Sequence, residues 1–152
     1  MKIVYSFFVL LLLFGCQNNV IFEQTKSFDG QRWNRFDFIE TEFEITDIDK
    51  LYDLQLNLVN QTTYSFDYIS LNVTLYLPGE TMRSRDIEIR LQDKNLVWSG
   101  EVHDGLVTTH FNYAKGMKFT TAGKVRLRIE NKMSKLNLEG VVSLCVAVNV
   151  GK

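Results

Sequence analysis

The sequence predicts an all-β protein, a single antiparallel β-sandwich of the Ig-like or jelly-roll type behind an N-terminal lipoprotein signal peptide. Three observations predict this class. Apolar and polar residues alternate with a period of two in several runs, as in strands with one buried face. Turn-forming residues separate these runs. No stretch of ten or more residues keeps the 3.6-residue period of an amphipathic helix. Seven to nine strands are expected, in an order that sequence alone leaves open.

The first part of the predicted domain is rich in aromatic residues. They are dense between positions 33 and 38, and apolar residues resume at Phe43 and Ile45 in a different phase. The change of phase predicts a bulge or turn near Glu40-Thr41. Glutamates at alternate positions from 40 to 44 are expected to line the solvent-facing side of a strand.

The clearest strands lie in the middle of the chain. Leucines alternate with polar residues over 54–58, and a longer run over 68–77 has an aliphatic face and a mixed polar and tyrosine face. Pro78-Gly79 predicts the turn that ends this second run. Alternation returns over 87–91, and the turn Asp93-Lys94-Asn95 leads to Leu96 and Trp98, which predicts a hairpin.

The remaining expected strands are shorter or less regular. A short strand is expected over 110–113, and an alternating one over 125–129 follows Gly123. A turn or two of helix is the most that 131–138 is expected to form. Residues 141–150 are apolar on both faces and are expected to form the last strand.

Residues 1–15 have the order of a secretory signal peptide: the basic Lys2, an uncharged apolar run, and a small residue before the cut. The apolar run is shorter than the ~20 residues needed to span a bilayer. Leu13-Phe14-Gly15-Cys16 resembles the lipobox of bacterial lipoproteins. This predicts cleavage before Cys16 and attachment of diacylglycerol and N-acyl groups, such as palmitate, to that cysteine. The alternative is an ordinary signal peptide cut at another bond, which leaves a free thiol.

The residues after Cys16 bear on localisation. Several acyl chains hold a protein on a membrane permanently, because each buried methylene contributes about 0.8 kcal/mol. Gln17 rather than aspartate follows the cysteine, which favours sorting to the outer membrane. The first carboxylate is Glu23, so no acidic cluster directs the protein to the cell surface, and a domain facing the periplasm is favoured. Residues 16–27 are expected to form a lipidated tether, and 28–152 the β-sandwich.

Composition and cysteine count narrow the class further. Removal of residues 1–15 from the 152 leaves 137, enough for one domain with a core that folds without disulfides. The mature chain would have 16 basic and 18 acidic side chains. Because it carries no excess of positive charge that would attract nucleic acid, nucleic acid is not an expected partner. With Cys16 lipidated, Cys145 has no cysteine to pair with. It lies in the apolar run 141–148 and is expected to be buried in the core.

The sequence contains no convincing catalytic or metal-binding group. His103 and Asp104, with His110 further along, are the only grouping that resembles a metal site or a general base, and their spacing matches no ligand motif. A solvated turn at His103-Asp104-Gly105 fits better. Neither a Gly-x-Ser-x-Gly elbow nor a phosphate-binding glycine loop is present. A non-enzymatic protein without cofactor or metal is therefore expected.

Aromatic side chains supply the candidate partner surface. Tyr68 and Tyr76 share the polar face of their strand, so this face is expected to be partly exposed. Trp33 and Trp98 are the other two candidates for this surface. Aromatic rings also form platforms for sugar rings. For each of the four, packing in the core or at its rim is the alternative.

A series of motifs occurs in a fixed order from Cys16 nearly to the end of the chain. The motifs are Trp33 before an aromatic strand, Tyr52-Asp53-Leu54-Gln55-Leu56, Tyr64-x-x-x-Tyr68-x-x-Leu71, Pro78-Gly79-Glu80, Asp86 with Leu91 and Asp93, Trp98-Ser99-Gly100, Gly123, Glu130 with Met133, and Leu138-Glu139-Gly140-Val141. This series resembles the gliding-motility lipoprotein GldH family, and Ser70 and Asn95-Leu96 depart from the family pattern. The resemblance implies a cell-envelope lipoprotein that is needed for surface gliding, is linked to the type IX secretion apparatus, and has no catalytic residues.

Two functional hypotheses follow. The first is a structural or assembly subunit whose partners are other envelope proteins of the gliding and secretion machinery. The second is an envelope carbohydrate-binding module that uses its tryptophans. The first is preferred, because the resemblance spans the mature chain and a permanent anchor suits a fixed component.

Overall fold

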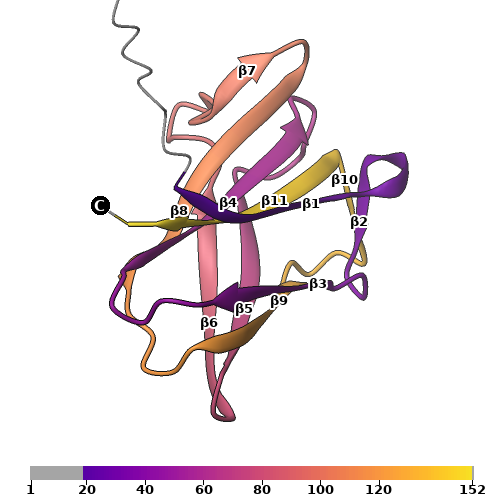
Figure 1. Ribbon diagram of the computed structural model, residues 1–152. Coiled ribbons are helices and arrows are strands. Elements are labelled where there is room, and N and C mark those ends of the chain that lie inside the picture. Colours follow the sequence, from indigo (N-terminus) through magenta and orange to yellow (C-terminus); the bar gives the residue numbers. More distant parts are fainter. Residues whose placement is uncertain (1–18, 152) are drawn as a thin grey trace, which may run out of the picture.

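The computed structural model describes residues 19–151, whose regular secondary structure consists almost entirely of β-strands (Figure 1). The predicted signal peptide and Cys16 lie outside the described residues. No helix in the described part of the chain is long and apolar enough to cross a membrane. A single 3-10 turn, η1 (Asp29–Gln31), follows the first strand. The strands are β1 (Val20–Ser27), β2 (Arg32–Asn34), β3 (Ile39–Ile45), β4 (Tyr52–Gln61), β5 (Tyr68–Leu77), β6 (Thr81–Arg90), β7 (Glu101–His103), β8 (Leu106–Met117), β9 (Gly123–Asn131), β10 (Asn137–Glu139) and β11 (Val141–Val150).

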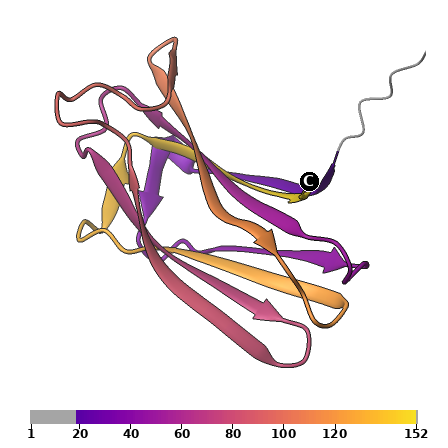
Figure 2. The same cartoon turned by 90° about the vertical axis from the view of Figure 1, so that its left-hand side faces the viewer.

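Two antiparallel sheets form the layers of a sandwich (Figures 1 and 2). The five-stranded sheet has the order β1-β11-β4-β8-β7, and the four-stranded sheet has the order β3-β9-β5-β6. The small sheet formed by β2 and β10 lies between the layers at one end (Figure 1). The predicted all-β antiparallel sandwich is confirmed. Its eight strands of seven or more residues agree with the predicted number, and three further strands have three residues each.

The core lies between the sheets and consists of the apolar face of each alternating strand. In β4 the three leucines at 54, 56 and 58 are buried, whereas Gln55 and Asn57 face outward and are partly exposed. β5 presents Ile69, Leu71 and Val73 to the same core. Full burial of a side chain of this size contributes roughly 1.5–3 kcal/mol, so these faces determine which side of each strand points inward.

Side chains at the edge strands join the two layers. On one side, Phe22 of β1 packs against Phe43 of β3 with ring centroids 5.7 Å apart, and the Thr41 hydroxyl donates to the Gln24 side-chain oxygen. On the opposite side, Nη2 of Arg85 in β6 donates to the carbonyl oxygen of Tyr113 in β8 at 2.7 Å. The same guanidinium lies 4.5 Å from the Tyr113 ring centroid. Burial raises the pKa of Tyr113, and Arg85 partly opposes this rise.

The tether predicted for residues 16–27 is wrong over its second part. Residues 20–27 form β1, which pairs with β11 from Val20 opposite Asn149 to Ser27 opposite Ser143. Phe22 is the one aromatic residue that this strand contributes to the core margin. The remaining positions are mostly polar because β1 is an edge strand, and for that reason the period-two pattern did not reveal it.

The apolar alternation changes phase between residues 33–38 and 43–45 for a reason other than the predicted one. β3 keeps an uninterrupted alternation, with Thr41 buried and Glu40 exposed, so it has no bulge near Glu40-Thr41. The chain turns instead at residues 35–38, between β2 and β3. Because β2 and β3 belong to different sheets, their inward faces need not share a phase.

The turn or two of helix expected within residues 131–138 is absent from the structure. A loop follows β9, in which the Met133 amide donates to the Asn131 side-chain oxygen at 2.8 Å. Residues 137–139 then form β10 and pair with β2. Leu138 is buried opposite Trp33, so the apolar residues of this segment serve the end of the core rather than a helix face.

Cys145 does not lie in the core. Leu144, Val146 and Val148 occupy the inward face of β11, so Cys145 points outward between Thr25 of β1 and Asn57 of β4. It is partly exposed and makes no disulfide. The apolar residues on both faces of this strand concealed the alternation that would have placed it correctly.

Candidate interaction surface

The two candidate tyrosines lie on the outer face of the four-stranded sheet. Both are on β5, which is flanked by β9 and β6, and both are partly buried by their neighbours. Tyr76 lies opposite Arg126 of β9 and Met82 of β6, and Tyr68 lies opposite Arg90 of β6. The sequence-based placement of these two residues on an outward, partly exposed face is therefore confirmed.

An arginine accompanies Tyr76. The Arg126 guanidinium carbon is 4.0 Å from the ring centroid of Tyr76, close enough for a cation-π interaction. In the same part of the sheet, the ring of Phe38 lies 4.0 Å from the guanidinium carbon of Arg128. Aromatic rings and arginines are the residue types enriched where protein surfaces dock.

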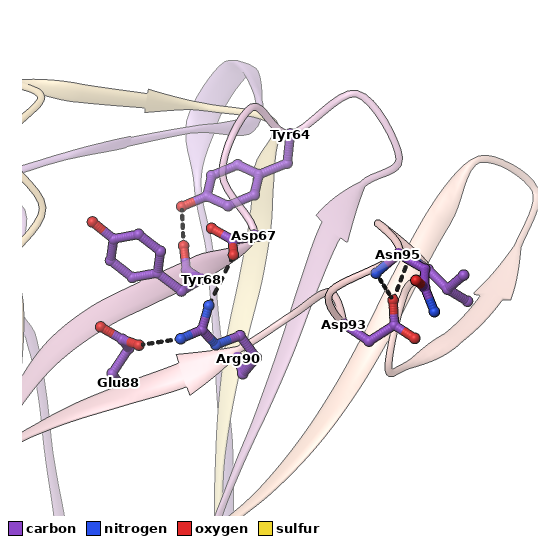
Figure 3. A network of polar contacts seen from close by, with 8 residues as sticks. Tyr64, Asp67, Tyr68, Glu88, Arg90, Asp93 and Asn95 are labelled. Carbon is purple, nitrogen blue, oxygen red and sulfur yellow. Dashed lines mark hydrogen bonds and ion pairs between the residues drawn. The ribbon is translucent and has the colours of Figure 1, made fainter.

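A network of polar contacts surrounds Tyr68 (Figure 3). Arg90 pairs with Asp67 at 2.9 Å through Nη1 and with Glu88 at 3.2 Å through Nη2. The Tyr64 hydroxyl donates to the carbonyl oxygen of Tyr68 at 3.3 Å. Exposed ion pairs contribute only about 0–1 kcal/mol each to stability. Their main effect here is to hold the Arg90 side chain in one position beside Tyr68.

The aromatic residues before β5 support this corner of the surface. The rings of Tyr64, Phe66 and Tyr68 follow one another with centroids 5.7 and 6.5 Å apart. Tyr64 is buried, and burial raises its pKa above the ordinary value of 10. The charge that Tyr68 acquires on ionisation adds to this rise. Tyr64 thus stays neutral over the ordinary pH range and acts as a hydrogen-bond donor to the backbone of β5.

Between the two tyrosines the surface is polar and hydrogen-bonded. The Asn72 side-chain amide donates to Ser84 at 3.0 Å and to Asp86 at 2.7 Å. The hydroxyls of Thr74 and Ser84 lie 2.9 Å apart. These bonds link β5 to β6 and give the face a fixed pattern of donors and acceptors.

Opposite charges meet along the margin of this face. The glutamates of β3 lie outward, as predicted, and each is opposite a basic residue of β9: Glu40 faces Arg128, Glu42 faces Arg126, and Glu44 faces Lys124. Cross-strand pairs of opposite charge stabilise a sheet by roughly 0.2–1 kcal/mol each. The acids therefore have a partner in the fold and need no catalytic explanation.

The two candidate tryptophans differ in their exposure. Trp33 is 0% exposed. Its ring stacks on Phe28 with centroids 4.6 Å apart, and its Nε1 donates to the carbonyl oxygen of Asp37 at 2.8 Å. Trp98 is only partly exposed and packs against the core. The candidate partner surface predicted from four residues is therefore wrong for Trp33, and a sugar platform that includes Trp33 is not available.

The histidine grouping is a turn, as its sequence suggested. Asp104 and Gly105 have positive φ angles of 48° and 77° and connect β7 to β8. His103 and Asp104 are exposed, with 3.0 Å between Nδ1 and Oδ2, whereas His110 contacts the Asn57 side chain at 2.8 Å in the middle of the sheet. Among residues 19–151, no three histidine, cysteine or acidic side chains are grouped to hold a metal ion.

Sequence reasoning missed Arg90 and Arg126 as members of the candidate surface. Both alternate with core residues, in 87–91 and 125–129, so their outward direction was readable from the sequence. Their position beside Tyr68 and Tyr76 was not, because it depends on β6 and β9 being the neighbours of β5.

Comparison with known proteins identifies the family. A model of the GldH lipoprotein family matches residues 20–148, which is nearly all of the described sandwich. The chain belongs to the GldH lipoprotein family. The GldH membership predicted from the motif order is thereby confirmed, and the family description names its members as lipoproteins.

Two relatives resemble this GldH-family chain over most of their length. The gliding motility lipoprotein GldH homolog of Christiangramia forsetii is 23% identical over 145 residues, which cover 95% of this chain and 88% of the relative. The gliding motility lipoprotein GldH of Flavobacterium johnsoniae is 24% identical over 142 residues, which cover 93% and 87%.

A solved structure with a partial resemblance is the crystal structure of the infectious bursal disease virus VP2 subviral particle. It is 17% identical, with a TM-score of 0.38, and the match covers 85% of this chain and 33% of that chain. A TM-score of this size does not establish a common fold.

Proposed function

We propose that this chain is a non-catalytic, lipid-anchored cell-envelope protein required for gliding motility, and that it acts as a structural or assembly component linked to the type IX secretion machinery. The observation that carries the proposal is the family match over residues 20–148. Both relatives are named gliding motility lipoproteins, and each match covers more than nine-tenths of this chain. The likeness therefore concerns the folded domain and not only a signal peptide.

The anchor in this proposal is Cys16, with diacylglycerol and N-acyl groups, in the outer membrane with the domain facing the periplasm. The support is the sequence Leu13-Phe14-Gly15-Cys16 and the family's description as lipoproteins. Mass spectrometry of the protein purified from membranes tests this part. An unmodified Cys16, or a mature terminus elsewhere, would contradict it.

The docking face in this proposal is the outer face of the four-stranded sheet between Tyr68 and Tyr76. It combines partly exposed aromatic rings, adjacent arginines and a fixed hydrogen-bonded centre. Tyrosine and arginine side chains are enriched among the residues that dominate binding energy at protein interfaces, where they occupy well-packed positions from which water is excluded. The expected partner is another envelope protein of the same machinery.

A deletion strain complemented with variants tests the function and the face together. Loss of gliding on deletion, restored by the natural chain, is expected. The double variant Tyr68→Ala with Tyr76→Ala should accumulate normally yet fail to restore gliding. Asn112→Ala, on the outer face of the other sheet, is the matched control and should restore it. Normal gliding and secretion in the deletion strain would refute the proposed function, and full activity of the double variant would refute the face.

A further inference from the structure

The position of Cys16 relative to β1 limits where the domain can sit. Only four residue steps separate Cys16 from Val20, the first residue of β1. Since an extended chain covers at most ~3.6 Å per residue, this distance cannot exceed roughly 14 Å. If Cys16 is lipidated, as the proposed function holds, the end of the sandwich at which β1 begins lies next to the bilayer.

That end is formed by segments from several parts of the chain. The Val150 amide donates to the carbonyl oxygen of Asn19 at 2.7 Å, and the Gly151 amide donates to that of Leu51 at 2.8 Å. The Gly116 amide donates to the Asp53 carboxylate at 2.8 Å. In Figure 2 the start of β1, the C-terminal end of β11 and the loops after β3 and β8 lie together at the right-hand end of the sandwich.

Four apolar side chains at this end of the sandwich are exposed to solvent. Val20 and Ile21 are 45% and 43% exposed, and Ile48 and Leu51 of the loop after β3 are 39% and 42% exposed. Other exposed apolar residues lie elsewhere, such as Leu96 in the turn after β6. Val20 and Ile21 belong to β1 itself, the strand that follows the anchor, and Leu51 is bonded through Gly151 to the end of β11, which pairs with β1.

Basic side chains accompany the apolar ones. Lys115 and Lys118, at the end of β8 and just after it, are exposed. Neither forms an ion pair within the described part of the chain. Of the acids nearby, Asp47 pairs with Lys50 at 3.4 Å and Asp53 accepts the Gly116 amide. Asp49 of the same loop is exposed and makes no ion pair within residues 19–151, so the two lysines outnumber the acid left unpaired at this end. Lysines near a bilayer are attracted to anionic headgroups.

We propose that this end of the sandwich rests on the lipid surface, with the side chains of Val20, Ile21, Ile48 and Leu51 in the headgroup region and Lys115 and Lys118 beside anionic headgroups. The partner is the bilayer itself. Because the strands run between the two ends of the sandwich (Figure 2), the outer faces of both sheets stay open to the side for protein contacts. A fixed orientation of the Tyr68 and Tyr76 face then follows from the short link to the anchor.

Depth-dependent fluorescence quenching on the full lipidated chain tests the orientation. In a Cys145→Ser background, a single cysteine is introduced by Leu51→Cys, by Ile48→Cys or, as control at the other end, by Leu96→Cys, and is labelled with an environment-sensitive dye. The proteins are placed in phosphatidylethanolamine and phosphatidylglycerol vesicles that contain brominated lipid. Side chains of an interfacial segment reach the boundary between headgroups and acyl chains, so labels at 48 and 51 should be quenched at least about twice as strongly as the label at 96. Urea unfolding checks that each variant is folded.

The outcomes separate the orientation from the anchor. If the protein floats with the vesicles but positions 48 and 51 are quenched no more than position 96, the orientation is refuted and the lipid anchor stands. If the protein does not float, the proposed lipidation fails and the orientation fails with it. Lys115→Glu with Lys118→Glu should weaken quenching at 51 in these vesicles and leave it unchanged in phosphatidylcholine vesicles; an equal effect in both would refute the role of the lysines.

Discussion

Replacement of Trp33 by alanine measures how much this buried ring contributes to the stability of the domain. Trp33 is 0% exposed, stacks on Phe28 with ring centroids 4.6 Å apart, and donates to the carbonyl oxygen of Asp37. Removal of a fully buried tryptophan leaves a cavity and costs about 3–5 kcal/mol. Because the free energy of unfolding of a domain is only about 5–15 kcal/mol, Trp33→Ala is expected to leave the domain marginally stable.

A graded series makes this expectation quantitative. Trp33→Phe keeps a ring against Phe28 but removes the hydrogen bond to Asp37, and is expected to cost about 1–3 kcal/mol. Phe36→Ala, at a position that is 71% exposed, is the control and should change stability by less than about 0.5 kcal/mol. Urea unfolding followed by far-UV circular dichroism measures all three variants. If Trp33→Ala were as stable as the natural chain, Trp33 would not be part of the core, and its assignment to a partner surface would be restored.

Three further predictions follow from the described contacts. A Cβ on Gly100 would lie 2.4 Å from the carbonyl oxygen of Thr108, so Gly100→Ala should destabilise the domain by about 2 kcal/mol or more. Ser99→Ala is the control and should not destabilise it. Equal urea midpoints for the two variants would contradict the close approach of Gly100 to Thr108. Cys145 faces outward, so its thiol should react with a labelling reagent without denaturant, and Cys145→Ser should cost less than about 1 kcal/mol; reaction only after unfolding would return it to the core. Burial raises the pKa of Tyr64 in the folded domain, so above pH 10 the phenol ionises in the unfolded chain before it ionises in the folded one, and the free energy of unfolding falls as the pH rises. The urea midpoint should therefore decrease less from below pH 10 to above it in Tyr64→Phe than in the natural chain.

The sequence by itself determined which way most side chains point. In β4 and β5 one face is apolar and the other polar, and because successive side chains of a strand alternate, the pattern indicated the inward face directly. The same reasoning placed Tyr68 and Tyr76 outward and the glutamates of β3 in solvent. The order of motifs was sufficient for the family, which the match over residues 20–148 confirmed.

Only the tertiary structure decided which strands are neighbours, and with them the composition of the candidate surface. Tyr76 meets Arg126 because β9 lies beside β5, and Trp33 is buried because β10 and Phe28 cover it. Strand alternation is a local property that each segment carries in its own residues. Which strands pair is not a local property, because every strand edge offers the same backbone N–H and C=O groups to any other strand. The pairing is therefore decided by the arrangement that buries the apolar faces of all strands together.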